Sequence, residues 1–424
     1  MYARRLSRLT LPFAALAALL AASLACGAVT GNPPAENTPA ATAAVDATTE
    51  PQETIAAATQ AEDATAASTA TNQTGAATEA ATEAATEAPA PTEAPQPDAP
   101  ARYLVIQNGK FGYIDETGEL VIPAQFDQAG DFFEGRAVIY QGGLFGYIDV
   151  DGNVVVEPQY ELGSHFHEGV AWVKTGDKAG YIDPSGAFVI EPQFDDAYDF
   201  AEGLAAVRVG SLYGYIDHSG AYVIEPQYAF GEGFSEGLAY VTPKYEDGGL
   251  GGYIDPTGAL VIPAQFAHAG PFSAGLAFAT FIEPSDAPKY GYINPAGEFV
   301  IEVQFDEVEP FAEGVAAVTL IDADRRPQTG YINAAGEYVI EPKFLLGGSF
   351  SGGLAGVLLN KDDAPRGVAW GFADATGAVV IAPQFVYDGY SPAPTFHNGL
   401  ALVQMAEGYA YVNPAGEIVW GPAQ

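Results

Sequence analysis

The chain has 424 residues, with 54 acidic against 16 basic side chains, a formal net charge of −38 and a single cysteine. This acidity makes nucleic acid and anionic membrane surfaces poor partners for the body of the protein, because like charges repel. One cysteine also excludes an intrachain disulfide.

The first 26 residues have the pattern of an export signal. A basic start, an apolar stretch and a cleavage-like tetrapeptide are formed by Arg4, Arg5 and Arg8, by residues 9–24, and by Ser23-Leu24-Ala25-Cys26. The apolar stretch is short and alanine-rich for a membrane span. The lone cysteine resembles the acylated residue of bacterial lipoproteins, although Ser23 and Leu24 stand in swapped order for that pattern. We therefore predict a cell-envelope protein anchored to a membrane through Cys26, with simple secretion as the alternative.

Residues 27–100 are predicted to be a disordered tether. They consist mainly of Ala, Thr, Glu and Pro, with 11 acidic residues and no basic ones. Such a segment has too few large apolar side chains to form a core. A flexible chain of this length reaches on the order of 50 Å, and its like charges extend it further. It would hold the rest of the protein clear of an envelope surface.

From residue 101 onward, the stretch Gly-Tyr-Ile-Asp or a close variant recurs at intervals of 34 to 41 residues. Its opening glycines are Gly112, Gly146, Gly180, Gly214, Gly252, Gly291, Gly330 and Gly371, and Ala410 takes the ninth place. A period of this size indicates supersecondary units that must stack on their neighbours to bury their apolar faces. Residues 101–424 are therefore predicted to form one repeat domain.

Each unit is predicted to be a β-hairpin followed by a further strand. Turn sequences such as Asp183-Pro184-Ser185-Gly186 join two short runs of β-forming residues. The segment Phe-x-Glu-Gly-Leu-Ala-x-Val supplies the next strand. The acidic residue of each hairpin is thus interpreted as a turn cap rather than a ligand, with the representative turn residues Asp115, Gly118, Asp183, Gly186, Asp255 and Gly258.

Aromatic residues return at two phases of the repeat. One set is Phe126, Tyr160, Phe194, Tyr228, Phe266, Phe305, Phe344 and Phe385, and the other is Phe133, Phe166, Phe200, Phe234, Phe272, Phe311, Phe350 and Phe396. Side chains that return once per unit are expected to stack into a continuous core. We favour this interpretation over a platform for ligand stacking.

The pattern resembles the WG-repeat family of bacterial proteins, whose unit reads Trp-Gly-x-Ile-Asp, then Val-Ile-x-Pro, then Phe-x-Glu-Gly-Leu-Ala. The resemblance covers residues 103–422. The name-giving tryptophan is present only at Trp370, and the same place elsewhere holds Phe111, Phe145, Ala179, Tyr213, Gly251, Tyr290, Thr329 and Tyr409. This place is expected to be a packing position of variable size. The resemblance implies a β-rich repeat domain and no single enzymatic activity.

The predicted fold class is all-β, but its closure is left open by the sequence. Residues 103–106 match the last strand of a unit, and residues 409–420 match a hairpin without that strand. Eight full units and one unit split between the termini would close a propeller-like ring with a blade shared by both ends, and closure removes exposed sheet edges. An open β-superhelix with truncated ends is the alternative.

Extra residues and basic residues gather in the link between the last strand of one unit and the next hairpin. The longer links are residues 243–250, 282–289, 321–328 and 360–369. Insertions at one phase of a repeat lie on one face, which is a common binding face. Nine basic residues fall in these links or their shorter counterparts: Lys110, Lys174, Lys178, Lys244, Lys289, Arg325, Arg326, Lys361 and Arg366. The candidate binding rim is Lys244, Lys289, Arg325, Arg326, Lys361 and Arg366, although exposed loops collect lysines in any protein.

No motif indicates catalysis, a cofactor or a metal. The histidines at 165, 167, 218, 268 and 397 lie at differing phases, and His165-Phe166-His167 lacks a third ligand. Asp149 to Asn153 resembles part of a calcium loop but occupies an ordinary turn position. We predict a non-enzymatic module that binds an unknown protein or an envelope polymer. A glycan-binding module using Trp172, Trp370 or Trp420 is the alternative, and a hydrolase or metal-dependent enzyme is less favoured.

Overall fold

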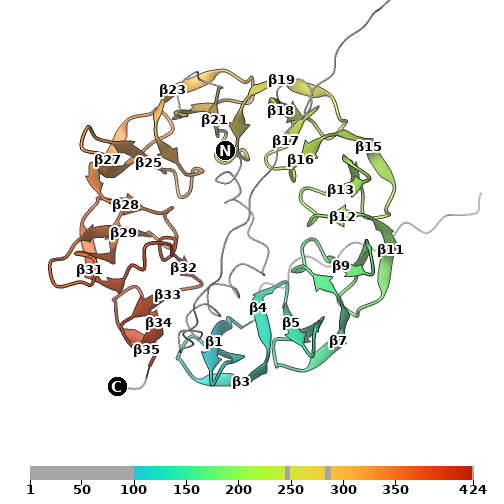
Figure 1. Ribbon diagram of the computed structural model, residues 1–424, viewed down its shortest axis with the longest axis horizontal. Coiled ribbons are helices and arrows are strands. Elements are labelled where there is room, and N and C mark those ends of the chain that lie inside the picture. Colours follow the sequence, from blue (N-terminus) through green and yellow to red (C-terminus); the bar gives the residue numbers. More distant parts are fainter. Residues whose placement is uncertain (1–99, 244–248, 282–287, 423–424) are drawn as a thin grey trace, which may run out of the picture. The chain divides into compact units, whose positions relative to one another are not determined.

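The computed structural model describes residues 100–243, 249–281 and 288–422, and within these ranges every regular element is a β-strand. The strands form nine small antiparallel sheets that follow one another around a ring (Figure 1). We call these sheets blades 1 to 9 in chain order. The export signal, Cys26 and the tether lie outside the described residues. The described domain is therefore all-β, with the arrangement of a nine-bladed β-propeller.

Within each blade the strands follow in chain order from the centre of the ring to its periphery (Figure 1). Blades 1 to 3 contain β1 (Tyr103–Gln107), β2 (Lys110–Ile114) and β3 (Leu120–Phe126); β4 (Gln128–Phe133), β5 (Arg136–Gln141), β6 (Leu144–Asp149) and β7 (Val154–Tyr160); and β8 (Leu162–Gly163), β9 (Ala171–Thr175), β10 (Lys178–Ile182) and β11 (Phe188–Phe194). Blades 4 to 6 contain β12 (Asp196–Ala197), β13 (Ala205–Val209), β14 (Leu212–Ile216) and β15 (Tyr222–Tyr228); β16 (Phe230–Gly231), β17 (Ala239–Thr242), β18 (Gly251–Ile254) and β19 (Leu260–Phe266); and β20 (His268–Ala269), β21 (Ala277–Thr280), β22 (Tyr290–Ile293) and β23 (Phe299–Phe305). Blades 7 to 9 contain β24 (Glu307–Val308), β25 (Ala316–Ile321), β26 (Pro327–Ile332) and β27 (Tyr338–Phe344); β28 (Leu346–Gly347), β29 (Leu354–Asn360), β30 (Val368–Asp374) and β31 (Val379–Val386); and β32 (Phe396–His397), β33 (Leu400–Met405), β34 (Gly408–Val412) and β35 (Ile418–Trp420).

The sequence repeat and the blade are offset from each other. The Gly-Tyr-Ile-Asp hairpin supplies the two outer strands of one blade, and the segment after it supplies the two inner strands of the next blade. The hairpin β10–β11, for example, belongs to blade 3, whereas β12 and β13 belong to blade 4. Each sequence repeat therefore joins two neighbouring blades, and its hydrophobic face is completed only within the array.

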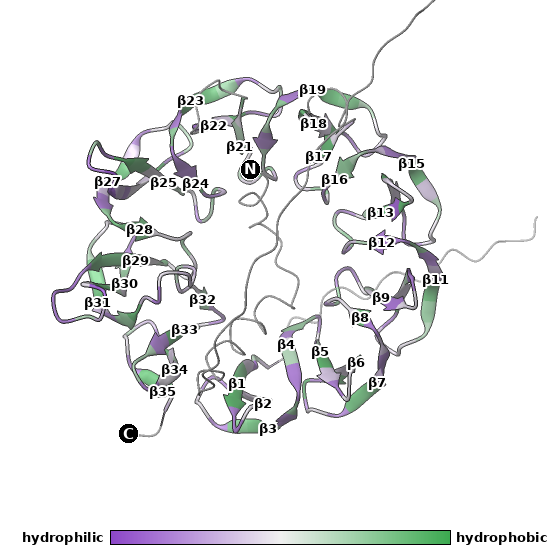
Figure 2. Cartoon of the chain, viewed as in Figure 1, coloured by the Kyte–Doolittle hydropathy of each residue, from purple (hydrophilic) through white to green (hydrophobic). Residues whose placement is uncertain are grey.

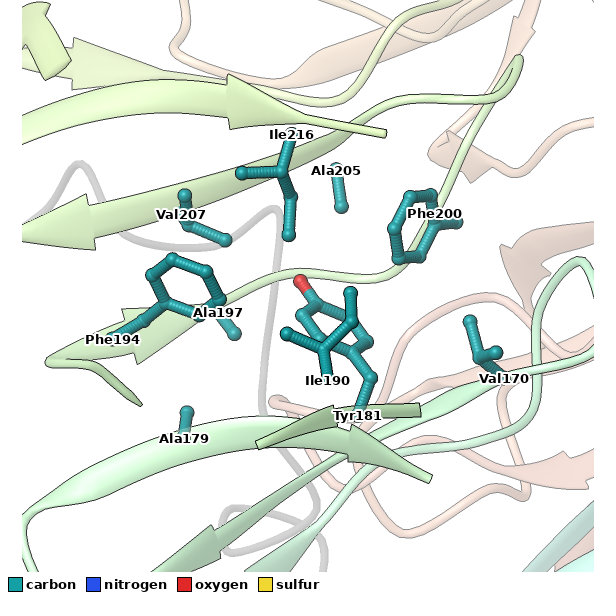
Figure 3. Packing of buried hydrophobic residues seen from close by; sticks show 10 residues of the cluster. All are labelled: Val170, Ala179, Tyr181, Ile190, Phe194, Ala197, Phe200, Ala205, Val207 and Ile216. Atoms are coloured by element: carbon teal, nitrogen blue, oxygen red, sulfur yellow. The ribbon is translucent and has the colours of Figure 1, made fainter. Parts of the chain in front are cut away.

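The tyrosine of Gly-Tyr-Ile is the centre of each interface between blades. Tyr181 of blade 3 is fully buried, its ring meets Phe200 of blade 4 edge-on at 5.0 Å, and its hydroxyl donates to the carbonyl of Tyr198 at 2.8 Å. Ile190 and Val207 pack around this pair (Figure 3). Equivalent ring pairs lie 4.8 to 5.2 Å apart at Tyr113–Phe132, Tyr147–Phe166, Tyr215–Phe234, Tyr253–Phe272, Tyr292–Phe311, Tyr331–Phe350 and Phe372–Phe396. The recurrent aromatics are thus core residues, as the sequence predicts.

One member of the second aromatic set was assigned to the wrong residue. The sequence analysis places Phe133 in this set, but Phe132 is the residue that meets Tyr113, at 4.9 Å. Phe133 is 39% exposed and lies against His165 instead, at 4.4 Å. Two adjacent phenylalanines precede Gly135 in this unit, and the Phe-x-Glu-Gly spacing of the other units, with the ring three residues before the glycine, selects Phe132.

The glycine of Gly-Tyr-Ile is required by close approach within the hairpin. A Cβ atom on Gly180 would lie 2.5 Å from the Ile190 carbonyl oxygen and 2.7 Å from the nitrogen of Pro192. The pairing register shifts between Ala179 and Tyr181, so the outer strand bulges over the glycine. Ala410 is tolerated in blade 9 because Gly421 is the residue that lies against its methyl group.

The hairpin turns are closed by their acidic or amide side chain. Asp183 Oδ1 accepts hydrogen bonds from the amide of Ser185 at 2.8 Å and from the amide of Ala187 at 3.1 Å. In the equivalent turn the hydroxyl of Thr117, followed by backbone amides, holds the pKa of Asp115 below its usual range. Gly186 has a φ of 86°, and a Cβ there would approach the Val156 side chain of the preceding blade to 2.9 Å. These residues act in turn geometry and blade packing.

The ring is closed between blade 9 and blade 1. Gly118 lies against Val419 of β35, as each turn glycine lies against the preceding blade, and the Tyr411 hydroxyl donates to the carbonyl of Leu104 at 2.9 Å. The split unit of the sequence is thereby completed in space, with its hairpin in blade 9 and its strand β1 in blade 1. The expectation of a blade built from both termini is wrong, however, because β1 pairs with β2 in a sheet of three strands.

Blade 1 has three strands within the described residues, and a larger side chain lies where the other blades have an innermost strand. Tyr103 stands where other blades have alanine, such as Ala205 beside Tyr181. Its ring meets Tyr411 edge-on at 5.5 Å, and its hydroxyl donates to the carbonyl of Asn398 at 2.5 Å. Tyr103 thus supplies the aromatic contact that a phenylalanine in or just after the innermost strand supplies at the other interfaces.

The residue before the glycine of Gly-Tyr-Ile varies in size between blades, and the side chains packed against it vary with it. At Gly251, the ring of Tyr240 occupies the space of a side chain, because a Cβ would lie 2.1 Å from its Cζ. At Thr329, a buried hydroxyl pair forms with Thr319 at 2.8 Å. Trp370 is 3% exposed and meets Tyr387 edge-on at 5.7 Å. Several sizes therefore fit this packing position, as the sequence predicts.

Candidate binding surfaces

The loops between the second and third strands of the full blades gather at one edge of the ring. We call this edge the loop rim; with the matching loop of blade 1, its described residues are 108–109, 142–143, 176–177, 210–211, 243, 249–250, 281, 288–289, 322–326, 361–367 and 406–407. Residues 244–248 and 282–287, including the candidate Lys244, lie outside the described residues. The described loops of blades 7 and 8 are longer than those of blades 1 to 4. Variation between blades is therefore concentrated at this edge.

Three rim lysines are held in a repeated ion pair between blades. Lys178 of blade 3 lies 2.7 Å from Asp195, whose other oxygen accepts the amide of Gly210 in blade 4 at 2.6 Å. Lys289 lies 2.6 Å from Asp306 in the same way, and Lys110 pairs with Asp127. The hydrogen bond from Lys178 holds the pKa of Asp195 below its usual range. The candidate Lys289 therefore has a structural partner and is a poor choice for contacting a ligand.

The remaining candidates lie on the long loops of blades 7 and 8, among carboxylates. Arg326 Nη2 lies 2.9 Å from Asp324 Oδ2, and Lys361 Nζ lies 3.7 Å from Asp363 Oδ1. Arg325 and Arg366 are exposed and form no ion pair with any described residue. This part of the loop rim presents guanidinium groups and acidic groups side by side.

The opposite edge carries a chain of carboxylate contacts that the sequence analysis did not recognise. The turns between the first and second strands, at residues 134–135, 168–169, 202–203, 236–237, 274–275, 313–314, 352–353 and 398–399, form what we call the inner turns. Glu134 accepts hydrogen bonds from the amides of Glu168 and Gly169 in the next blade, both at 2.8 Å. Further contacts of this kind are Glu168 to Gly203, Glu202 to Gly237, Glu236 to Gly275, and Glu313 to Gly352 and Gly353.

These contacts explain the glutamate of Phe-x-Glu-Gly. The residue adopts a positive φ, for example 52° in Glu168, which costs free energy for any residue with a side chain. The charge-assisted hydrogen bonds to the next blade offset that cost. The signal was available in the sequence as a glutamate repeated before glycine, with Ala274, Gly352 and Asn398 as its exceptions.

Restoring a missing carboxylate is expected to stabilise the ring. Ala274 has a φ of 53° and stands where Glu236 and Glu313 bind the following blade. In Ala274→Glu, the new side chain would accept the amide of Gly314, and we expect a gain of about 1 kcal/mol in the free energy of unfolding. Urea denaturation followed by tyrosine fluorescence measures the change. Ala274→Gln is the control for side-chain length, and an unchanged or lower midpoint in Ala274→Glu would show that these contacts do not stabilise the ring.

Three histidines lie near the inner turns of neighbouring blades. His167 Nε2 lies 3.7 Å from Asp199 Oδ2, and His218 Nε2 lies 3.5 Å from Glu168 Oε2. His218 also stacks on Phe200 at 4.0 Å. Burial lowers the pKa of His165 to about 4, so this ring is neutral at pH 7. The arrangement joins blades 3 and 4 through pairs of side chains.

The described residues hold no cluster of three or more His, Cys, Asp or Glu side chains that could bind a metal ion. Asp149, in the calcium-like segment, caps its own turn by accepting the amides of Asp151 and Asn153. Burial raises the pKa of Glu232 to about 7, and its backbone carbonyl accepts the Tyr215 hydroxyl in the usual interface bond. Across residues 100–243, 249–281 and 288–422, no helix is long and apolar enough to cross a membrane.

Comparison with known protein families agrees with the repeat pattern. The family profile described as WG containing repeat matches residues 111–145, 145–178, 180–213, 213–242, 252–280, 290–320, 330–361 and 370–409. The chain belongs to the WG-repeat family. No curated protein matches it significantly. The WG-repeat domain is similar to two solved structures, a computationally designed protein named Ika8 and Kluyveromyces lactis Hsv2. Ika8 has 10% identity and a TM-score of 0.42, over 67% of this chain and 95% of that chain. Hsv2 has 11% identity and a TM-score of 0.29, over 66% of this chain and 87% of that chain.

Proposed function

We propose that this WG-repeat protein is a non-enzymatic scaffold of the cell envelope, which binds a protein or polymer partner through the loop rim of blades 7 and 8. The observation that supports the proposal is that the repeated polar side chains make hydrogen bonds within the ring. Turn aspartates cap their own turns, interface tyrosines donate to the next blade, and inner-turn glutamates bind the next blade. The loops of the rim, by contrast, differ between blades in length and in their exposed charged side chains, which supports a role in display and binding.

A mixed-charge rim on an acidic protein favours a partner with both charges. Arg325, Arg326 and Arg366 offer planar donors that bind carboxylate or phosphate groups through two hydrogen bonds. The neighbouring Asp324 and Asp363 favour cationic groups on the same partner and disfavour a uniformly anionic polymer. No observation favours the glycan alternative, because Trp370 is buried and Trp172 and Trp420 are packed against core clusters.

Removing the rim cations is expected to abolish partner capture without unfolding the ring. The variant Arg325→Gln, Arg326→Gln, Lys361→Gln and Arg366→Gln removes four positive charges from exposed or half-exposed positions. The control Lys174→Glu with Arg208→Glu produces the same change in net charge on blades 3 and 4. We expect quantitative cross-linking in the envelope fraction to lose a partner about tenfold in the rim variant only. Equal cross-linking by both variants would contradict the proposal.

Membrane attachment through Cys26 has its own test. In Cys26→Ser the acylated thiol is absent, so we expect the protein to move from the membrane fraction to the soluble exported fraction. Stable anchoring of a lipoprotein depends on its buried acyl chains. Phase partitioning into detergent measures the change, with Ser23→Ala as the control for altered signal processing. A Cys26→Ser protein that remains with the membrane would argue for a different attachment.

A further inference from the structure

The outermost strand of blade 6 differs from the other outermost strands. In seven blades this strand contains a proline, and in blade 9 a proline follows the strand end by two residues: Pro123, Pro158, Pro192, Pro226, Pro263, Pro342, Pro383 and Pro422. Strand β23 of blade 6 reads Phe-Val-Ile-Glu-Val-Gln-Phe, with Val303 where five blades within the described residues have proline inside the strand. Proline lacks the amide hydrogen, and natural proteins use it to prevent further pairing at sheet edges. Blade 6 therefore lacks the protection that the rest of the ring has.

The outer side of β23 is available to another strand. The order of the sheet is β20-β21-β22-β23, so β23 is its last strand within the described residues. Figure 2 shows hydrophobic residues along the outer strands, including β23. Val300 is 47% exposed at this periphery. A seven-residue strand with this composition and no proline has the features of a segment that recruits an additional strand.

An exposed aromatic cluster adjoins one end of β23. Phe281 is 39% exposed and lies 5.1 Å from Phe299, the first residue of β23, and 5.7 Å from Phe266 of blade 5. The same position holds Thr175 in blade 3 and Val209 in blade 4, which are smaller. A strand edge and an exposed aromatic anchor thus occur together in the blade that departs from the repeat.

We propose that β23 binds an extended segment of a basic protein partner, which adds to blade 6 as a fifth strand and places an apolar side chain against Phe281. This inference rests on the proposed binding function and names a second contact and its chemistry. The partner segment carries Lys or Arg opposite Glu302, which is exposed at the centre of the strand. A second copy of this chain fits poorly, because antiparallel self-pairing would set Glu302 against its own counterpart on a body with a net charge of −38.

The test uses the full-length protein and two fluorescent ten-residue peptides. Both alternate Val, Thr and Tyr, and they differ only in carrying a central Lys or a central Glu. The key variant is Val303→Pro, which restores the proline of blades 2, 3, 4, 7 and 8 and is therefore compatible with the blade. We expect saturable anisotropy changes for the Lys peptide, and binding about tenfold weaker to Val303→Pro, because an added strand loses one or two backbone hydrogen bonds.

Reversing the charge separates strand addition from nonspecific adhesion. Glu302→Lys is expected to reverse the preference, so that the Glu peptide binds more tightly than the Lys peptide. The fourfold rim variant should bind the Lys peptide as the unaltered protein does, so failure of the rim proposal and failure of this one are distinguishable. Equal binding to the unaltered protein and Val303→Pro would overturn the inference. Self-association that Val303→Pro abolishes would overturn the choice of partner, because the edge would then serve a second copy.

Discussion

Replacing Gly214 with alanine is expected to destabilise the domain by about 3 kcal/mol, a cost in the range for overpacking a core. The added Cβ would lie 2.6 Å from the Ile224 carbonyl oxygen and 2.7 Å from the nitrogen of Pro226. Both are backbone atoms of the paired strand, which cannot rotate away as the end of a side chain can. Relief would require β14 and β15 to separate, and the interface bond from Tyr215 to the carbonyl of Glu232 would be weakened with them.

The natural alanine of blade 9 provides the matched comparison. Ala410→Gly should cost about 0.5 to 1 kcal/mol, which is the usual cost of glycine within a strand. One substitution removes a glycine and the other introduces one. An effect of glycine on the unfolded chain alone would therefore change the stability in opposite directions. Urea denaturation monitored by near-ultraviolet circular dichroism measures both. Similar losses for the two variants would show that the close approach at Gly214 is not what requires glycine.

Much of the fold is encoded locally, which is why the sequence predicts it. The Asp-x-x-Gly turns, the alternating strands and the interface aromatics each depend on a few consecutive residues that recur in every unit. Phe200 could be identified as core from its period alone, whereas its contact with Tyr181 of the preceding blade was hidden. The offset between repeat and blade arises from strand pairing, which a period does not reveal.

The polar contacts were less predictable because they join residues far apart in the chain. The carboxylate of Glu134 binds amides 34 and 35 residues later, and backbone amides leave no mark in the sequence. The same limit applies to the loop rim. The sequence predicts Lys289 as a binding residue, whereas the structure places the carboxylate of Asp306 beside it. Single departures from the repeat, such as Ala274 and Val303, are visible in the sequence. Their structural consequence can be inferred only from the contacts that the equivalent residues make in the other blades.

Ring closure depends on one such departure, and Tyr103→Ala is expected to open the ring. The substitution restores the alanine of the other blades but removes the ring that packs on Tyr411 and the hydroxyl bond to Asn398. Truncation of a buried aromatic side chain costs about 3 to 5 kcal/mol. Contacts in a repeat array are mainly between neighbours, so the loss should be confined to blades 1 and 9.

Hydrogen exchange measured by mass spectrometry on the full chain distinguishes local opening from general destabilisation. In Tyr103→Ala we expect faster exchange in β1 and β34 and little change in β14. Tyr103→Phe keeps the ring and loses only the hydroxyl bond, so it should cost about 1 kcal/mol and leave the exchange of β34 nearly unchanged. If Tyr103→Ala leaves β1 and β34 as protected as in the unaltered chain, the turn contact between Gly118 and Val419 is sufficient for closure, and Tyr103 is not the residue that holds the ring together.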